Sequence, residues 1–232
     1  MSKPTTAGLH KRWNAGAALL AMSALTACGG GSDNAAAPTA QLTIIGTAAV
    51  GVALAGAAIA VTCSTNTGAA TSNTDGTFNV TIGDGKGPCV LTATKGATVL
   101  RSVTPGAGVA NITPLTDMLT DYLATRAGTT AANLLTNTNG KAILSDSKAL
   151  TDAQAGLVSL LKTTYNVTIS TTNFLTTTIT TPTGGTQSGG DKDLDVLRTS
   201  GLTTTNGTVN TSVSTAANNA AKSNPYAITG GT

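Results

Sequence analysis

The sequence predicts an α+β protein, with a small antiparallel β-sandwich over residues 41–104 and a mainly helical region over residues 111–202. In the first region, apolar and polar residues alternate in short runs separated by turn residues, a pattern typical of half-buried strands. From Thr113 onward the apolar residues recur every three or four positions, which is the period of an amphipathic helix. Residues 166–190 and 203–232 are Thr-rich, low-complexity segments. They are expected to form short edge strands or to be disordered, and disorder is favoured for the tail, residues 203–232.

Residues 1–27 have the features of a secretory signal peptide. An apolar stretch at 15–24 is too short to span a bilayer, and it follows a basic segment that contains Lys3, His10, Lys11 and Arg12. The stretch ends in Leu25-Thr26-Ala27-Cys28, which resembles the lipobox of bacterial lipoproteins. The resemblance implies that a diacylglycerol is attached to Cys28 and that the leader is cleaved before this residue. The alternative is an ordinary signal peptide in which the cysteine is coincidental.

Residues 28–40 read as a flexible tether, because they are rich in Gly and Ala and contain nothing that would start a core. Gly29 follows the cysteine directly. In enterobacterial lipoproteins an Asp at that position favours retention in the inner membrane. The resemblance therefore implies a lipid-anchored protein of the bacterial outer membrane, on its periplasmic face or at the cell surface.

The charges are few and balanced once the leader is removed. Of thirteen basic residues, Lys3, Lys11 and Arg12 precede Cys28, so ten basic residues face ten acidic ones. Nucleic-acid binding and a polybasic membrane surface are therefore excluded, since both need clustered positive charge. The only His is His10, and the acidic residues are all Asp. The mature chain thus lacks the commonest general bases and metal ligands, and we expect no catalytic residue, metal or cofactor.

Residues 44–61 form a nearly uncharged run that is long enough to be considered as a transmembrane helix. Three features argue against it: its Ala and Gly contribute little transfer free energy, glycines interrupt it at 46, 51 and 56, and no close Lys or Arg would fix an orientation. Apolar residues at both ends follow the two-residue period of strands instead: Leu42 and Ile44, then Ala57, Ile59, Val61 and Cys63. We expect two strands with a turn at 53–57.

Further strand signals follow at short spacing. Phe78, Val80 and Ile82 alternate with polar residues, after a turn at 73–76 that ends in Asp-Gly. A Gly-rich cluster at 83–88 reads as another turn. Strands are then expected around Cys89 to Ala93 and over residues 99–103.

Two segments of this region carry a family resemblance. Residues 51–61 (GVALAGAAIAV) and 74–80 (TDGTFNV) are similar to the Gly-Ala strand entry and the D-G-x-[FY] turn of carboxypeptidase-regulatory domains, which are transthyretin-like and CnaB-like β-sandwiches. The resemblance covers roughly residues 41–104. It implies a structural or binding module, and it does not imply peptidase activity.

Cys63 and Cys89 are the only other cysteines of the mature chain. In an oxidising envelope compartment, two cysteines on neighbouring strands most simply pair, and we predict a disulfide. Two buried free thiols and a metal pair are the alternatives. A metal pair is disfavoured because no His is present to complete a site.

Three helices are expected between residues 113 and 164. The first begins with Thr113 as N-cap and Pro114 at the first helical position, and it ends at Gly128. Its apolar stripe contains Met118 and Tyr122, which could be read as ligand-contacting residues but are at a spacing more typical of a core. A short helix is expected over residues 130–135 and a longer one over residues 147–164.

Residues 191–195 (DKDLD) have the alternating Asp of an EF-hand loop. That loop needs Gly at its sixth position and Glu at its twelfth, where this chain has Val196 and Leu202. We therefore interpret the segment as the start of a helix, with Asp near the positive end of the helix dipole.

These observations favour a lipid-anchored envelope protein with a structural or binding role. Its expected partners are the membrane, through Cys28, and an envelope protein or a glycan. One alternative is a small-ligand carrier with an apolar pocket between sandwich and helices. A less favoured one is a hydrolase that uses Ser, Asp or Lys groups, for which the chain lacks a G-x-S-x-G motif.

Overall fold

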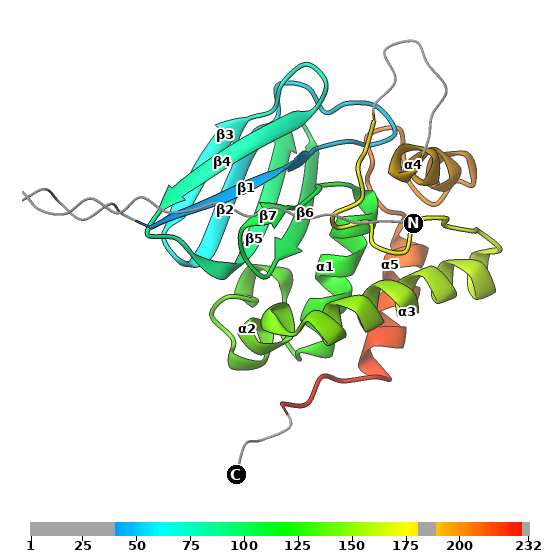
Figure 1. The fold of residues 1–232 in the computed structure, drawn as a ribbon. Helices are drawn as coiled ribbons and strands as arrows, with labels where there is room; N and C mark the ends of the chain where they lie inside the picture. The colour runs from blue at the N-terminus through cyan, green and yellow to red at the C-terminus, as the bar shows by residue number, and fades with distance from the viewer. Residues whose placement is uncertain (1–39, 181–188, 229–232) are drawn as a thin grey trace, which may run out of the picture. The chain divides into compact units, whose positions relative to one another are not determined.

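A computed structural model describes residues 40–180 and 189–228, and within them seven strands form two sheets (Figure 1). The three-stranded sheet has the order β4–β1–β7, with β1 at Gln41–Thr47, β4 at Thr77–Gly83 and β7 at Gly108–Val109. The four-stranded sheet has the order β3–β2–β5–β6, with strands at Thr67–Thr71, Ala58–Thr65, Lys86–Lys95 and Thr98–Thr104. All pairs are antiparallel except β1 with β7. The predicted β-sandwich is confirmed.

The alternating apolar residues of these strands point into a single sandwich core. This core includes Ile44, Ile59, Phe78, Val80, Ile82, Leu91 and Leu100, none of which is more than 3% exposed. Many of its other members are Ala, which lets the backbones approach closely. At Gly46 the approach is also close, because a Cβ there would lie 2.1 Å from the carbonyl oxygen of Ala110.

A disulfide joins Cys63 of β2 to Cys89 of β5, which are register partners on adjacent strands. Both residues are buried in the sandwich core, at 6% and 0% exposure. Since the cross-link closes a loop of 26 residues, it contributes about 3.5 kcal/mol in the chain-entropy description. The predicted pairing is confirmed, and it replaces much of the stability that aromatic residues would supply in another core.

Five α-helices follow the sandwich in the described residues: α1 (Pro114–Arg126), α2 (Thr138–Ser145), α3 (Ser147–Tyr165), α4 (Gly190–Thr199) and α5 (Thr211–Lys222). A single 3-10 turn, η1, covers Ala131–Asn133. The helices form a second core with the outer face of β6 (Figure 1). Leu100 points into the sandwich, whereas Val103 belongs to the helical core, so β6 serves both layers. The α+β fold class is confirmed.

Helix α1 begins as the sequence predicts. The Thr113 hydroxyl accepts from the Thr116 amide at 3.2 Å, and the Thr116 hydroxyl accepts from the Thr113 amide at 2.8 Å. This reciprocal capping satisfies two backbone donors, and Pro114 follows at the first helical position. Helix α3 closely matches the range expected for the longer helix.

Several strand boundaries differ from the expectation. The 83–88 cluster is only partly a turn, because β5 already begins at Lys86. Strands β3 and β7 were not predicted, since β3 contains only Thr, Gly and Ala and β7 has two residues. Val167 and Ile169, expected on an edge strand, lie outside regular structure and are buried in the helical core. Apolar alternation alone does not distinguish an edge strand from an irregular segment whose apolar side chains are buried in a core.

The expectation of a disordered tail over 203–232 is wrong for residues 211–222, which form α5. Val213, Ala217 and Ala221 recur every four residues and are buried against the helical core. The Thr- and Asn-rich composition hides this stripe, because two of its three members are Ala. Helix α2 was also not predicted; it is short and begins at the Asn137 cap, whose side chain accepts from the Gly140 amide at 2.9 Å.

Residues 44–61 are divided between β1, a turn region and β2, as the strand interpretation predicts. Across residues 40–180 and 189–228, the structure contains no helix with both the length and the apolarity that a membrane span requires. Cys28 and the rest of the leader and tether up to residue 39 lie outside the described residues.

Candidate functional site

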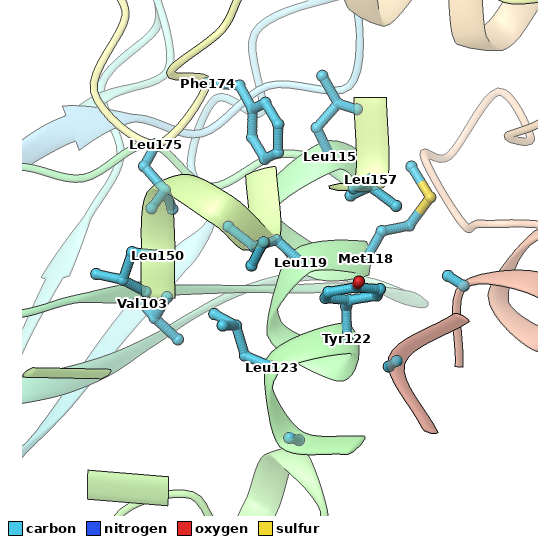
Figure 2. Close-up of a cluster of buried hydrophobic side chains, with 14 of the residues drawn as sticks. Val103, Leu115, Met118, Leu119, Tyr122, Leu123, Leu150, Leu157, Phe174 and Leu175 are labelled. Carbon is cyan, nitrogen blue, oxygen red and sulfur yellow. The ribbon is translucent and has the colours of Figure 1, made fainter. Parts of the chain in front are cut away.

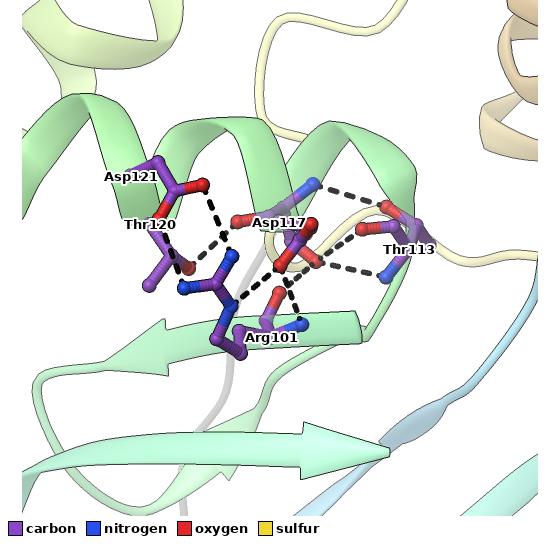
Figure 3. Close-up of polar contacts among 6 residues, drawn as sticks. Arg101, Thr113, Asp117, Thr120 and Asp121 are labelled. Carbon is purple, nitrogen blue, oxygen red and sulfur yellow. Dashed lines mark hydrogen bonds and ion pairs between the residues drawn. The ribbon is translucent and has the colours of Figure 1, made fainter. Parts of the chain in front are cut away.

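The seam between the two layers carries a charged cluster, which Figure 3 shows. On β6, Arg101 directs its Nε to Asp117 Oδ1 at 2.8 Å, and its NH1 and NH2 reach Asp121 at 2.9 and 3.0 Å. The backbone amide of Arg101 also donates to Asp117 Oδ1, at 3.0 Å. Thr116 adds a hydrogen bond from its hydroxyl to the Arg101 carbonyl at 2.9 Å. These contacts fix α1 on β6.

Burial raises the pKa of the Asp117 carboxyl, and the neighbouring Arg101 charge opposes that shift. One guanidinium faces two carboxylates, so the cluster has a net charge of about −1. A polar cavity of about 350 Å³ opens beside Arg101 and Asp121, with Thr125, Thr129 and Asn218 among its lining residues. Since both carboxylates are already bonded to Arg101, we interpret the cluster as a structural joint.

Asn111 forms a second, uncharged joint between the layers. Its side-chain oxygen accepts from the Thr47 amide at 3.2 Å, while its Nδ2 donates to the Thr177 carbonyl at 2.6 Å. Its backbone amide donates to the Leu175 carbonyl at 2.7 Å. Asn111 is 2% exposed, so each of these groups has left water and needs its partner. The segment 173–177 is thereby held beside the end of β1.

A groove lies along the seam between β7, α3 and the segment 173–177. Its apolar lining residues are Val103, Pro105, Val109, Leu150 and Leu175, and its polar ones are Thr104, Ser147, Thr151, Gln154, Asn173 and Thr176. None of them is charged. The groove volume is about 170 Å³, below the ~300–1,000 Å³ that is typical of small-molecule pockets. Its size suits part of an extended chain better than an enclosed ligand.

A second hollow adjoins the groove at Val109. It has a volume of about 240 Å³ and is lined by Ile45, Gly46, Thr47, Thr77, Phe78, Val109, Asn111, Thr178 and Ile179, again without a charged residue. Ile45 and Val109 are register partners on β1 and β7, and they are 44% and 39% exposed. Two adjacent exposed apolar side chains between two uncharged hollows distinguish this surface from the isolated exposed Val52 and Val99.

Asp191, Asp193 and Asp195 lie on α4, which confirms the interpretation of this segment as a helix start. Asp193 has a structural role: its carboxylate accepts from the Ser170 amide, the Ser170 hydroxyl and the Thr171 amide, each at 2.8 Å. Asp195 pairs with Arg198 at 2.7 Å. In the described part of the chain, no three His, Cys, Asp or Glu side chains are placed to hold a metal ion.

Asp191 differs from its neighbours. It is fully buried, and neither carboxylate oxygen has a hydrogen-bond partner among the described residues. Burial, and then the nearby charge of Asp195, raise the pKa of Asp191 to about 6, against a smaller opposing effect of Arg198. This group therefore changes charge in a mildly acidic range, which makes it a determinant of pH-dependent stability.

The other side chains considered in the sequence have structural positions. Met118 and Tyr122 are 3% and 5% exposed and lie in the helical core with Leu119 and Leu157, as Figure 2 shows. The core interpretation of this stripe is confirmed.

Ser145 and Lys148 have the S-x-x-K spacing of some serine hydrolases, a match that the sequence reasoning missed. The Ser145 hydroxyl donates to the Lys141 carbonyl at 3.0 Å, and Lys148 pairs with Asp152 at 2.6 Å. The Lys148 side chain is 82% exposed. An ammonium group in water that is paired with a carboxylate is a poor general base, so this spacing does not define a hydrolase site.

Comparisons of the chain with protein-family models, with curated proteins and with solved structures gave no match. Among the surfaces of the described residues, the uncharged one around Val109 has the features of a binding site: exposed apolar residues, adjoining hollows and a nearby strand edge.

Proposed function

We propose that this protein is a lipid-anchored protein of the bacterial cell envelope, held at the outer membrane through Cys28, with a structural or binding role. The observation that carries the anchor is the tetrapeptide Leu25-Thr26-Ala27-Cys28 at the end of a basic and then apolar leader. Acyl chains on Cys28 would give stable anchoring, because more than one chain is present after complete modification.

The folded part of the chain supports the proposal in two ways. A buried disulfide between Cys63 and Cys89 suits an oxidising compartment outside the cytosol. The first strand begins at Gln41, so the tether between it and Cys28 could reach roughly 40 Å when extended. That reach would hold the sandwich close to the membrane surface while leaving it free to meet a partner.

We assign the binding role to the sandwich and its seam with the helices. The support is the uncharged surface around Val109, together with the resemblance of residues 41–104 to carboxypeptidase-regulatory domains, whose members are structural or binding modules. A partner protein fits this surface better than a glycan, since its hollows have no charged residue and its exposed centre is aliphatic.

Metabolic labelling tests the anchor. The full-length gene is expressed in a bacterial host that is fed an alkyne-bearing fatty acid, and the purified protein is probed for the label. We expect labelled wild type, an unlabelled Cys28→Ser variant, and accumulation of the precursor when globomycin inhibits the lipoprotein signal peptidase. Cys28→Ser leaves the disulfide intact and so controls for folding. A protein that is cleaved normally but carries no lipid would show an ordinary signal peptide instead.

A further inference from the structure

We infer that the outer edge of β7 is a docking site for an extended, uncharged peptide segment of a partner protein, which adds to the three-stranded sheet at Val109. This inference deepens the binding role proposed above and does not depend on the anchor at Cys28. It rests on the direction of the backbone groups at β7, on the Gln154 side chain and on the absence of charge along the groove.

The hydrogen bonds around β7 show which backbone groups are open. The Ala110 amide donates to the Ile45 carbonyl at 2.8 Å, so it points toward β1. Successive residues of an extended strand direct their N–H and C=O groups to opposite edges, and those of Val109 therefore point away from β1. Asn111 has the same orientation as Val109, and its amide is taken by the Leu175 carbonyl at 2.7 Å.

The segment 173–177 thus pairs with the outer edge at Asn111 and not at Val109. Among the described residues, no strand covers the outer edge of β7, which is the last strand of its sheet. Val109 is 39% exposed and lines both hollows. An open N–H and C=O pair at a strand edge is the element that an incoming strand uses for pairing.

Gln154 supplies a side-chain hydrogen-bond donor to the groove. The side chain is 4% exposed, and its Oε1 accepts from the Leu175 amide at 3.3 Å. Its Nε2 group donates to no described residue and is not among the buried side-chain atoms that lack a partner, so it is accessible from the groove that Gln154 lines. A side-chain N–H₂ group that faces the groove can donate to a peptide carbonyl that would lie between β7 and α3.

The lining of the groove defines the chemistry of the segment. The hollows on both sides of Val109 contain no Asp, Lys or Arg, so a charged side chain would lose water there without gaining a partner. Successive side chains of an added strand project to opposite faces of the sheet. One set would enter the groove over Leu150 and Leu175, and the other would cover Ile45 and Ile179. Small apolar and hydroxyl side chains fit both places.

Selection from a phage-displayed library of uncharged peptides, each of about ten residues, tests the inference on the purified full chain. The best peptide is then synthesised in three forms: unmodified, and N-methylated at one or the other alternating set of residues. Hydrogen exchange followed by NMR reports the protection of the Val109 amide. We expect at least tenfold slower exchange of that amide with the unmodified peptide. One N-methylated form should lose binding at least tenfold and the other should keep it, because only one edge of the peptide pairs.

A pair of chemically identical substitutions provides the matched control. Gln154→Glu keeps the oxygen that accepts from Leu175 but removes the free donor, and we expect the dissociation constant to rise about tenfold. Gln41→Glu makes the same change at an exposed position of β1 and should leave binding unchanged. If Gln154→Glu fails to fold, hydrogen exchange of the Val109 amide in the wild type, with and without the peptide, still tests whether the peptide pairs with β7.

Four outcomes would overturn the inference. They are the failure of any uncharged peptide to be selected, protection confined to amides other than Val109, binding that is indifferent to both N-methylations, and concentration-dependent protection of Val109 without peptide. The last would assign the edge to a second copy of this chain. None of these outcomes affects the lipid-labelling result, so failure of the docking site and failure of the anchor are separable.

Discussion

The sandwich and the helical layer reach stability by different means. The sandwich contains seven short strands whose core is largely aliphatic, and the Cys63–Cys89 bond cross-links it. The helical layer has no cross-link within the described residues; it packs Leu, Ala and the side chains of Figure 2 against the outer face of β6. From this comparison we expect the helical layer to depend on the sandwich, because β6 closes one side of the helical core.

This dependence has a physical origin in β6. Val103 belongs to the helical core, and Arg101 on the same strand holds Asp117 and Asp121 of α1 (Figure 3). If the sandwich opens, α1 loses its apolar floor and its charged joint together. The reverse does not follow, because the sandwich core lies on the other side of β6 and retains its own contacts.

The largest expected effect comes from removing the cross-link. The double variant Cys63→Ala/Cys89→Ala should lose about 3.5 kcal/mol of unfolding free energy, since the unfolded chain regains the entropy of an open loop. Denaturant titration measures the loss, and hydrogen exchange shows where it falls. We expect amides of β2 and of α3 to lose protection together. If the helix amides stay protected while the sandwich amides exchange freely, the helical layer does not depend on the sandwich.

The second effect concerns Asp191. Its folded pKa of about 6 exceeds its ordinary value of 3.8, so the folded state binds more protons than the unfolded state between these values. Stability should therefore fall as the pH rises through about 4 to 6, and the cost is complete above that range. Asp191→Asn should gain up to about 3 kcal/mol at pH 7.5, because each unit of pKa shift corresponds to about 1.4 kcal/mol, and nothing at pH 3.5.

Thermal and denaturant unfolding at both pH values measure this effect, with Asp193→Asn as the control two residues away. Because the Asp193 carboxylate accepts from Ser170 and Thr171, that variant should be less stable than the wild type at pH 7.5. Equal changes in unfolding free energy for Asp191→Asn and Asp193→Asn at both pH values would show that burial of the Asp191 carboxylate carries no electrostatic cost.

The smallest expected losses of stability come from ion pairs, the first of which joins Arg101 of β6 to Asp117 of α1. Arg101→Met should lose about 1 kcal/mol at pH 7, because Asp117 keeps the backbone amide of residue 101 but loses the guanidinium, and both partners are only partly buried. Lys148→Met removes an exposed i,i+4 pair on α3 and should cost at most about 0.5 kcal/mol. A double-mutant cycle of Arg101→Met with Asp117→Asn isolates the coupling, and a coupling near zero would mean that packing alone holds α1 on β6.

Sequence reasoning succeeded where a segment's own periodicity is strong and failed where a partner decides its structure. Phe78, Val80 and Ile82 mark β4, and the Thr113 cap marks α1, through patterns that are complete within a few residues. In contrast, α5 depends on Ala217 and Ala221, whose small side chains become informative only when they pack against the helical core. The groove combines residues from β6, β7, α3 and the segment 173–177, a combination that no local pattern contains.

By itself, the sequence determined strands β1, β2, β4, β5 and β6, the helices at 114–126 and 147–165 and the pairing of the two later cysteines, and its leader continues to predict an anchor at Cys28. Only the tertiary structure decided that β7 ends its sheet, that Gln154 lines the groove beside it and that Asp191 is buried without a partner among the described residues. The reason is that periodicity and capping act between near neighbours along the chain, whereas an open strand edge or an unpaired buried group is defined by what distant segments leave uncovered.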